Sequence, residues 1–401
     1  MTIEIRNPSE DGWRDAMLMT TAVFGDEPRD EDFERHGKML VRDRFWTAYD
    51  GGAPVGTAAD FPFRLTVPGG ELAAGGVTWV AVLPSHRRQG VLTQLMRREL
   101  DDLHERGEPL AVLWASEAVI YGRYGYGMAA PHFEMEADRS RFALRDDPGP
   151  RGKVRMLTLE DSLEPCTQVY ERVRAVTPGF NGRAREWWET YRLFDSEHHR
   201  HGASPKYVAV LELDGEPAAY AIYRIKAEWE AGFPKGQVRV VEALAASGHA
   251  ERDLWRFLFG IDLTVRVESR LDPASSLPLM VVDARSLNLR FNEGLWLRLV
   301  DVEGALAGRS YATDDAVVLE IGDAFCPWNA GRWRVGRDLE RTDAGADLAL
   351  DVADLASVYL GAFTFSRLAA AGRVRELQAG ALDRADALFR TPRPPYCPED
   401  F

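Results

Sequence analysis

The chain has 401 residues, of which 45% are hydrophobic and 28% are charged, and its formal net charge is −14. A chain of this length is expected to form two or three domains with apolar cores. The acidic balance argues against a nucleic-acid binder, because neutralising phosphates requires a basic surface. It would suit a cationic substrate, which a negatively charged protein attracts over long range.

The sequence shows no sign of a membrane-spanning or secreted protein. Residues 1–6 lack the basic start and the apolar run of a signal peptide. No stretch of about 18 apolar residues is present to span a bilayer. The 3 cysteines, Cys166, Cys326 and Cys397, lie far apart, which argues against a disulfide framework and a zinc site. We therefore expect a cytoplasmic protein in a reducing compartment.

The first part of the chain predicts mainly strands. In chain order we expect a strand at 3–6, a helix around 13–23, a polar, charged segment at 26–44, and antiparallel strand pairs at 45–58 and 61–82. The Gly-Gly steps within both pairs are typical of tight turns.

The stretch 77–103 has the clearest pattern. An apolar, β-branched run over 77–83 predicts a buried strand, which Pro84 ends because proline has no N–H to give to a ladder. After a basic turn at 86–90, leucine and methionine recur every three or four residues, which predicts a helix. A second apolar strand at 110–116 would lie parallel to the first in a right-handed crossover.

The turn between this strand and helix has the features of a phosphate site. The first turn of a helix has N–H groups without intrahelical partners, and its dipole favours an anion. Gly90 allows an anion to approach the backbone, and Arg87 and Arg88 add charge-assisted hydrogen bonds. The alternative is an ordinary strand–turn–helix connection with solvated arginines.

A tyrosine follows the second strand of the crossover. Tyr121 would face the same crevice, because open α/β sheets bind ligands beyond the carboxyl ends of their strands. A phenol is protonated at neutral pH and can donate to a thiolate leaving group. The alternative is an aromatic packing residue in a glycine-rich turn.

Three further patterns carry less weight. Gly122, Gly125 and Gly127 have the reverse of the dinucleotide-binding spacing, and Ser116 lacks the glycine-flanked elbow of a serine hydrolase. The histidine-rich run 197–201 has no second ligand group at a useful spacing, which favours a solvated loop over a metal cluster. We expect no bound metal.

From about residue 151 the order of elements repeats. Residues 207–224 again predict two strands joined by an Asp-Gly turn, and a strand at 238–246 precedes a helix at 251–259. This copy lacks paired arginines and has acidic residues at its helix start, so we expect a structural partner without phosphate binding. Residues 286–401 show no such repeat and end in a proline-rich, extended tail, a kind of tail that is usually frayed.

Two segments resemble a known family. Val80-Ala-Val-Leu-Pro-Ser-His-Arg-Arg-Gln-Gly90 and Ala115-Ser-Glu-Ala-Val-Ile-Tyr-Gly-Arg-Tyr-Gly-Tyr-Gly127 are similar to the acyl-CoA signature of GNAT N-acetyltransferases. More closely, they resemble the Eis (enhanced intracellular survival) family of aminoglycoside and amine acetyltransferases. The resemblance covers the whole chain, with further matches at 294–298 and 359–362.

The resemblance implies an α/β (α+β) fold of two tandem GNAT domains and a third domain. The expected domains are an acetyl-CoA-binding GNAT domain at 1–150, a degenerate GNAT-like domain at 151–285, and a sterol-carrier-protein-like domain with a catalytic C-terminal carboxylate at 286–401. It also implies a homo-oligomer, a hexamer in the family.

The resemblance also implies roles for individual residues. Val80 and Val82 would pair their backbone with the pantetheine arm of acetyl-CoA, and Ser116 would sit beside the thioester. Tyr121 would be the general acid for the CoA thiolate, and the carboxylate of Phe401 would be the general base for the amine. The expected pyrophosphate contacts are Arg87, Arg88, Gly90, Val91 and Leu92. The residues expected to line the amine pocket are Asp26, Trp79 and Asp400.

The terminal carboxylate can act as a base only if the tail is docked. A free α-carboxylate has a pKa of about 3.5, so at neutral pH it is ionised and can accept a proton or hold an ammonium group. Tyr396 and Phe401 are aromatic residues that could anchor the tail.

These implications predict an acetyl-CoA-dependent N-acetyltransferase that transfers acetyl directly to a small, polycationic amine, aminoglycoside-like or polyamine-like. The polar segment 27–44 departs from more apolar relatives and would change the amine specificity. Three alternatives stay open: a catalytically silent acyl-CoA or amine sensor, a lipid-binding protein that uses the third domain, and a lysine or peptide N-acetyltransferase.

Overall fold

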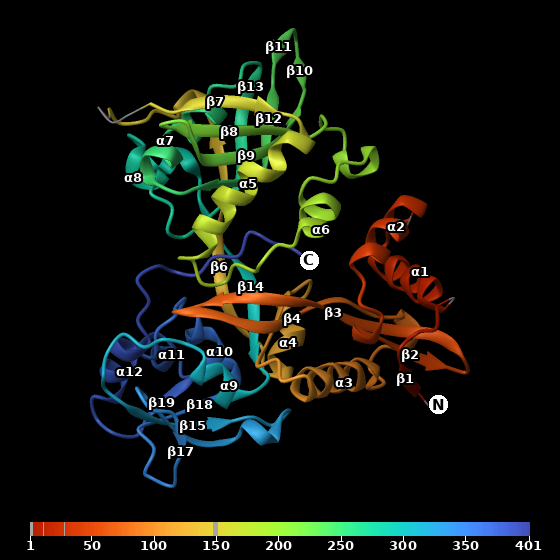
Figure 1. Ribbon diagram of the computed structural model, residues 1–401, viewed down its shortest axis with the longest axis vertical. Coiled ribbons are helices and arrows are strands. Elements are labelled where there is room, and N and C mark those ends of the chain that lie inside the picture. The colour runs from red at the N-terminus through yellow and green to blue at the C-terminus, as the bar shows by residue number, and fades with distance from the viewer. Residues whose placement is uncertain (1–2, 11, 28, 147–150) are drawn as a thin grey trace. The chain divides into compact units, whose positions relative to one another are not determined.

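A computed structural model describes residues 3–10, 12–27, 29–146 and 151–401. The chain divides into two compact units, drawn in Figure 1. The first unit combines Met1–Ala130, Pro178–Gly182 and Gly294–Phe401, and the second combines Pro131–Thr177 and Arg183–Glu293. The domain boundary predicted at 150/151 adjoins residues 147–150, which lie outside the described residues.

The first unit begins with the predicted strands and crossover. Its elements are β1 (Ile3–Arg6), α1 (Gly12–Phe24), α2 (Asp30–Met39), β2 (Phe45–Asp50), β3 (Ala53–Val67), β4 (Gly70–Val82), α3 (Val91–Glu105), β5 (Leu110–Trp114) and α4 (Ala118–Tyr121). Strands β1 to β4 pair antiparallel in sequence order, and β4 pairs parallel with β5. The polar segment 26–44 contains α2, and the two predicted strand pairs share one long strand, β3.

The helical periodicity of 92–103 is confirmed by the burial of one face of α3. Leu95, Met96, Leu100 and Leu103 are fully buried. The last three pack in one cluster with side chains of β4 and β5. Helix α3 therefore runs along one face of the sheet, with its amino end at the carboxyl end of β4 (Figure 1).

The parallel pairing of β4 and β5 is short. Ala74, Gly75 and Gly76 pair with residues 110–112 of β5, and in the described chain the pairing ends there. Residues 77–82 of β4 thus present a backbone edge toward β5 that has no strand partner. The other edge of β5 pairs antiparallel with residues 295–299 of β14 (Arg290–Leu299), a strand that the sequence had placed with the third segment.

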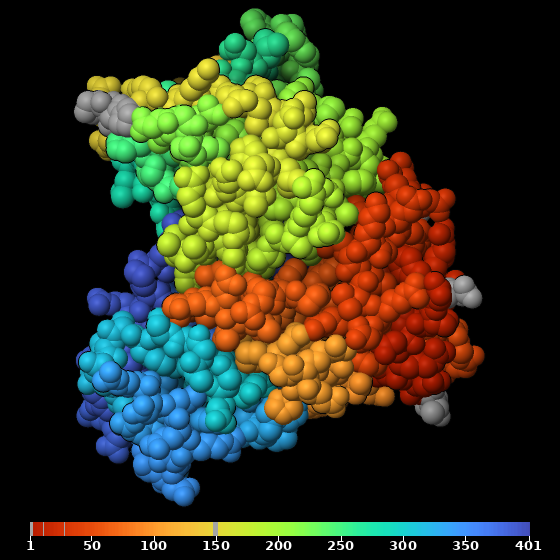
Figure 2. Space-filling model, in the orientation of Figure 1, coloured from red at the N-terminus to blue at the C-terminus, as the bar shows by residue number. Residues whose placement is uncertain are grey.

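The third segment forms its own five-stranded sheet within the first unit. Its elements are α9 (Val302–Ala307), β15 (Val317–Gly322), β16 (Gly331–Val335), β17 (Glu340–Arg341), β18 (Leu348–Asp351), α10 (Val352–Tyr359), α11 (Phe365–Ala370), β19 (Val374–Glu376) and α12 (Ala381–Phe389). The strand order is β17-β16-β15-β18-β19. The surface of this segment meets that of the first part of the unit (Figure 2). Arg97 of α3 lies over the ring of Phe325, and His104 stacks on Trp328.

The C-terminal tail is docked, unlike most proline-rich tails. Residues 395–399 are buried. The Tyr396 N–H donates to the Pro178 carbonyl at 3.0 Å, and the Tyr396 ring packs edge-on against Phe180. The Phe180 carbonyl in turn accepts a hydrogen bond from the N–H of Thr66 in β3. The short segment Pro178–Gly182 therefore joins the tail to the edge of β3.

The second unit repeats the element order of the first, as predicted. Its elements are β6 (Gly127–Asp138, entering from the first unit), β7 (Lys153–Leu157), α5 (Leu159–Arg174), α6 (Arg185–Trp187), a π-helical turn (Trp188–Arg192), β8 (Tyr207–Leu213), β9 (Glu216–Lys226), β10 (Trp229–Glu230), β11 (Phe233–Pro234), β12 (Gly236–Ala245), α7 (Gly248–Phe259), β13 (Thr264–Leu271) and α8 (Leu277–Met280). Strands β12 and β13 pair parallel at their amino ends, like β4 and β5. Across the described parts of both units, every helix is too short or too polar to cross a bilayer.

Candidate active site

Strand β4 contains a bulge at Trp79. Thr57 of β3 pairs with Ala81 and Ala59 pairs with Thr78, so that Ala58 faces both Trp79 and Val80. Trp79 has a φ of 48°, in the left-handed region that non-glycine residues seldom occupy. A bulge of this kind bends the strand and re-aims its backbone groups, and such conformations gather at functional sites.

Two buried hydroxyl groups hold the bulge. The Thr57 hydroxyl donates to the Trp79 carbonyl at 2.8 Å. The Thr20 oxygen of α1 lies 2.7 Å from the Thr57 oxygen and 2.8 Å from the Ala16 carbonyl. Because Thr57 has one proton and gives it to Trp79, Thr20 can satisfy either Thr57 or Ala16 but not both. The Trp79 carbonyl is therefore held by β3, on the side of β4 away from β5.

The predicted phosphate turn has the backbone that an anion requires. Gly90 precedes α3 with a φ of 82°, a Cβ there would meet open space, and no side chain caps the helix. Arg88 also has a positive φ, of 62°, which places two left-handed residues within three. Arg87 and Arg88 are exposed, and Arg87 Nε donates to the Val82 carbonyl at 3.3 Å. The first N–H groups of α3 thus face an open, basic turn.

The matching turn of the second unit is built differently. Ser247 caps α7, its hydroxyl accepting from the Ala250 N–H at 3.3 Å. Glu251 stands in the first turn of the helix, where its carboxylate accepts from the Ser275 hydroxyl and from the Ser276 N–H. A capped helix start with a carboxylate disfavours a phosphate, since like charges repel. The second copy thus differs from the first at the turn where phosphate binding is predicted.

Tyr121 lies at the end of α4, close to the open edge of β4. Its ring is 5% exposed and packs edge-on against Tyr126, with centroids 5.9 Å apart. Burial, assisted by Tyr124 and Glu117, raises the pKa of Tyr121 to about 12. Tyr121 belongs to the same packed cluster as Val80 and Leu92. Two of the residues predicted to contact the cofactor therefore belong to the apolar cluster that contains this phenol.

Tyr124 was missed by the sequence reasoning. Its hydroxyl lies 3.3 Å from the Thr93 hydroxyl in the first turn of α3, and its ring packs edge-on against Phe325. The available signal was the repeated tyrosine in Tyr-Gly-Arg-Tyr-Gly-Tyr. Tyr124 ties the turn after Tyr121 to the phosphate end of the helix.

A row of aromatic rings links the predicted amine pocket to the chain terminus. Trp79 packs against Phe61 with centroids 5.3 Å apart, Phe61 lies 5.8 Å from Phe63, and Phe63 lies 4.9 Å from Phe401. Gly76 makes room for this row, because a Cβ there would overlap the Phe63 ring. The signal for such a position was a glycine inside a strand, which often marks a close approach.

The remaining predicted residues lie near the ends of these elements. Val82 is half-buried on the open edge of β4, Val91 is buried, and Ser116 is exposed just beyond β5. Asp26 follows α1 and is exposed, and Asp400 is exposed beside the terminal residue.

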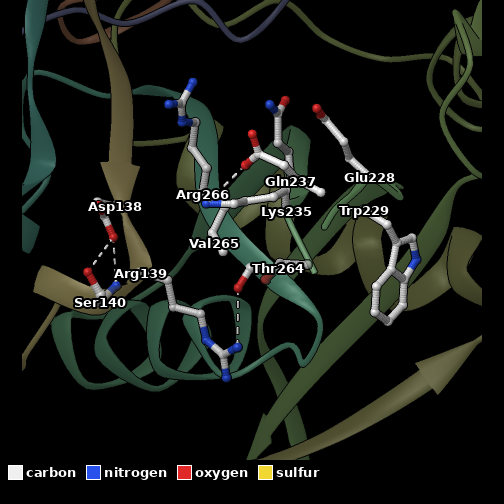
Figure 3. Close-up of a pocket in the computed structure, with 11 residues that line it drawn as sticks. Asp138, Arg139, Ser140, Glu228, Trp229, Lys235, Gln237, Thr264, Val265 and Arg266 are labelled. Atoms are coloured by element: carbon white, nitrogen blue, oxygen red, sulfur yellow. Dashed lines mark hydrogen bonds and ion pairs between the residues drawn. The ribbon is translucent and has the colours of Figure 1, made fainter. Parts of the chain in front are cut away.

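A hollow of about 870 Å³ lies in the second unit, lined by residues of both charges (Figure 3). Asp138 is bonded there to Ser140, and Arg139 reaches the Thr264 carbonyl. Gln237 and Thr264 stand at the amino ends of β12 and β13. Ligands of open α/β sheets bind at the carboxyl ends of strands, so this hollow does not correspond to an acyl-transfer site.

The comparisons with known proteins agree with this architecture. Acetyltransferase (GNAT) domain models match residues 4–129 and 179–299, and a sterol carrier protein domain model matches residues 302–398. The chain is 43% identical to an N-acetyltransferase of Streptomyces avermitilis, over 100% of both chains. It is 34% identical to N-acetyltransferase Eis of Mycobacterium tuberculosis, over 98% of each. The crystal structure of Eis1 from Mycobacterium abscessus matches it with a TM-score of 0.87 and 34% identity, over 100% of both chains.

Proposed function

Because this chain belongs to the Eis family of N-acetyltransferases, we propose that it moves acetyl from acetyl-CoA directly to a small amine with several positive charges. Use of acetyl-CoA follows from the GNAT fold. The amine and the residue roles belong to the proposal. The observation that carries it is the docked terminus, since the ring of Phe401 lies against Phe63 in the row that begins at Trp79.

The acyl donor would bind along the open edge of β4. The backbone of Val80 and Val82 would pair with the amide groups of pantetheine, as an added strand pairs with a sheet edge. The pyrophosphate would meet the uncapped start of α3 at Gly90, with Arg87 and Arg88 turning toward it from the exposed loop. Leu92 and Ser116 would complete this surface, and Val91 would contribute through its backbone N–H at the start of α3.

The transfer needs one base and one acid. The terminal carboxylate of Phe401 would take a proton from the amine as its nitrogen attacks the thioester carbon and the C–N bond forms. A backbone N–H of the 80–82 stretch would stabilise the oxyanion. As the C–S bond breaks, the Tyr121 phenol would give its proton to the sulfur and later regain one from solvent. The carboxylate then releases its proton to solvent, so that the neutral amine and acetyl-CoA give the N-acetyl amine and the free CoA thiol.

A polycationic amine suits the charges and rings around this site. Asp26, Asp400 and the terminal carboxylate carry negative charge, and the chain as a whole has a net charge of −14. Aromatic faces attract ammonium groups, which favours Trp79 as a pocket wall. His36 of α2 packs edge-on against Trp79, with centroids 5.3 Å apart, so the polar segment 27–44 contributes to this wall.

Replacing Tyr121 by phenylalanine tests the acid role. We expect Tyr121→Phe to lower kcat by roughly 10²–10⁴, the usual contribution of a general acid, with the acetyl-CoA Kd unchanged. The assay follows free thiol release from acetyl-CoA with a panel of polyamines, aminoglycosides and lysine peptides. Tyr126→Phe is the matched control, because it removes a buried hydroxyl that lies beside the Tyr121 ring and has no hydrogen-bond partner among the described residues. Full activity of Tyr121→Phe would remove the acid from the scheme.

The same panel decides between the proposal and its alternatives. Acetylation confined to lysine peptides would replace the small amine as substrate. Acetyl-CoA binding without transfer to any amine would indicate a catalytically silent sensor instead of an enzyme. Lipid binding that survives Arg87→Ala would point to the sterol carrier protein domain as the active part.

A further inference from the structure

Two buried carboxyl groups, one on α3 and one on β3, lie within hydrogen-bonding range of each other and take no part in the proposed chemistry. Glu99 is 0% exposed and stands on the apolar face of α3. Asp60 of β3 is 3% exposed. Asp60 Oδ1 accepts from Arg44 Nη1 at 2.5 Å, whereas Asp60 Oδ2 and both Glu99 oxygens are buried and accept no hydrogen bond from the described residues.

Among the residues that the structure describes, no cation is paired with Glu99. Arg44 is divided between Asp60 and Glu108, and Asp102, three residues further along α3, is held by Arg106 at 2.7 Å. Two ionised carboxylates sharing one guanidinium in a dry interior are strongly unfavourable.

The pKa values follow from this surplus of carboxyl groups. Burial, followed by the charge of Asp60, raises the pKa of Glu99 well above its usual range. Burial also raises the pKa of Asp60 to about 6, although Arg44 opposes it. Both shifts favour a pair that shares one proton, and the stronger burial of Glu99 favours that carboxyl as its holder.

Glu99 and Asp60 lie near both parts of the proposed site, the tyrosines at 121 and 126 and the phosphate turn at Gly90. Tyr126, whose buried hydroxyl also has no hydrogen-bond partner among the described residues, is an electrostatic neighbour of Glu99 and packs against Tyr121. Two turns along α3 from Glu99 is the uncapped start of the helix at Gly90. Any loosening of α3 from β3 would therefore displace the phosphate turn.

We propose that Glu99 is a positioning residue: it stays an uncharged carboxylic acid that donates its proton to Asp60 and so locks α3, with its phosphate turn, onto β3. Loss of this proton at high pH leaves two negative charges side by side, facing Asp102, Glu108 and the Tyr126 hydroxyl, with only Arg44 to balance them. The lock then opens and acetyl-CoA binds more weakly. This inference rests on the proposed binding of acetyl-CoA at α3, but not on the identity of the amine, the acid or the base.

Three variants of α3 test the lock. Glu99→Gln keeps a donor for Asp60 but cannot ionise, so acetyl-CoA affinity should match the wild type at neutral pH and should no longer fall at alkaline pH. Glu99→Leu leaves Asp60 without that donor and should weaken acetyl-CoA binding by about tenfold. Glu105→Gln, on the exposed side of the same helix, is the control and should follow the wild-type pH profile.

Infrared spectroscopy checks the proton directly and does not require ligand binding. The wild type should show the C=O stretch of a buried, protonated carboxylic acid at neutral pH, and Glu99→Gln should abolish it even if Glu99→Leu fails to fold. Absence of that band in the wild type would overturn the proposal, as would equal loss of affinity in Glu99→Gln and Glu99→Leu. Failure of the wild type to bind acetyl-CoA, with the band present, would instead refute the proposed function.

Discussion

The contact between Phe401 and Phe63 allows a quantitative test of the catalytic terminus. The rings meet edge to face with centroids 4.9 Å apart. An aromatic pair of this geometry contributes about 0.5–1.5 kcal/mol beyond its buried area. Phe63→Leu and Phe401→Leu both remove the pair, and Phe401→Leu keeps the α-carboxylate at the same chain position. Each single variant should therefore lower kcat by roughly two- to twelvefold, as the carboxylate spends less time in place.

The double variant gives the coupling between the two residues. Once one ring is gone, the second substitution has no aromatic pair left to break. The kcat of Phe63→Leu/Phe401→Leu should therefore be close to that of the less active single variant. Deletion of Phe401 is a different perturbation, because it moves the carboxylate back to Asp400. We expect it to lower kcat by about 10²–10⁴, the usual scale for a general base. A short C-terminal extension should act like the deletion, with unchanged thermal unfolding.

Thiol release at saturating acetyl-CoA and amine measures kcat for the wild type and all of these variants. Urea unfolding measures their stability and so separates a loss of activity from a loss of folding. Strictly additive losses in the double variant would show that Phe401 does not act through Phe63. An extended chain with normal turnover would refute the terminal carboxylate as base, whatever the ring contacts contribute.

Two further predictions concern the backbone of the site. Gly90→Ala forces a side chain into a left-handed conformation at a cost of about 1–2 kcal/mol and should weaken acetyl-CoA binding. Gly107→Ala is the control, because Gly107 is also left-handed and faces open space, and it should lower stability alone. Equal acetyl-CoA binding in the two variants would contradict the role of the phosphate turn. Thr57→Val removes the donor to the Trp79 carbonyl at a cost of about 1–3 kcal/mol and should lower kcat more than it changes the acetyl-CoA Kd. Thr57→Ser keeps the hydroxyl and should restore activity. A fully active Thr57→Val would show that the bulge does not need this hydrogen bond for catalysis.

Much of this protein was readable from local patterns. The strand that ends at Pro84, the helix face of Leu95, Met96 and Leu100, and the basic turn all depend on neighbours within a few residues, so periodicity and turn chemistry predict them. The second GNAT copy and its missing arginines were visible for the same reason. The resemblance to the family, carried by the segments 80–90 and 115–127, supplied the domain architecture.

The tertiary structure decided what depends on distant neighbours. Glu99 was visible as a charge on an apolar helix face, but only the fold places Asp60 beside it. The left-handed Trp79 exists because β3 pairs with β4 out of step by one residue, which no local pattern shows. Phe401 meets Phe63 across almost the whole length of the chain. The sequence alone thus determined the strand, the basic turn and the helix at which a phosphate is predicted to bind, whereas long-range pairing and packing decided how Tyr121, the bulge and the terminus are arranged.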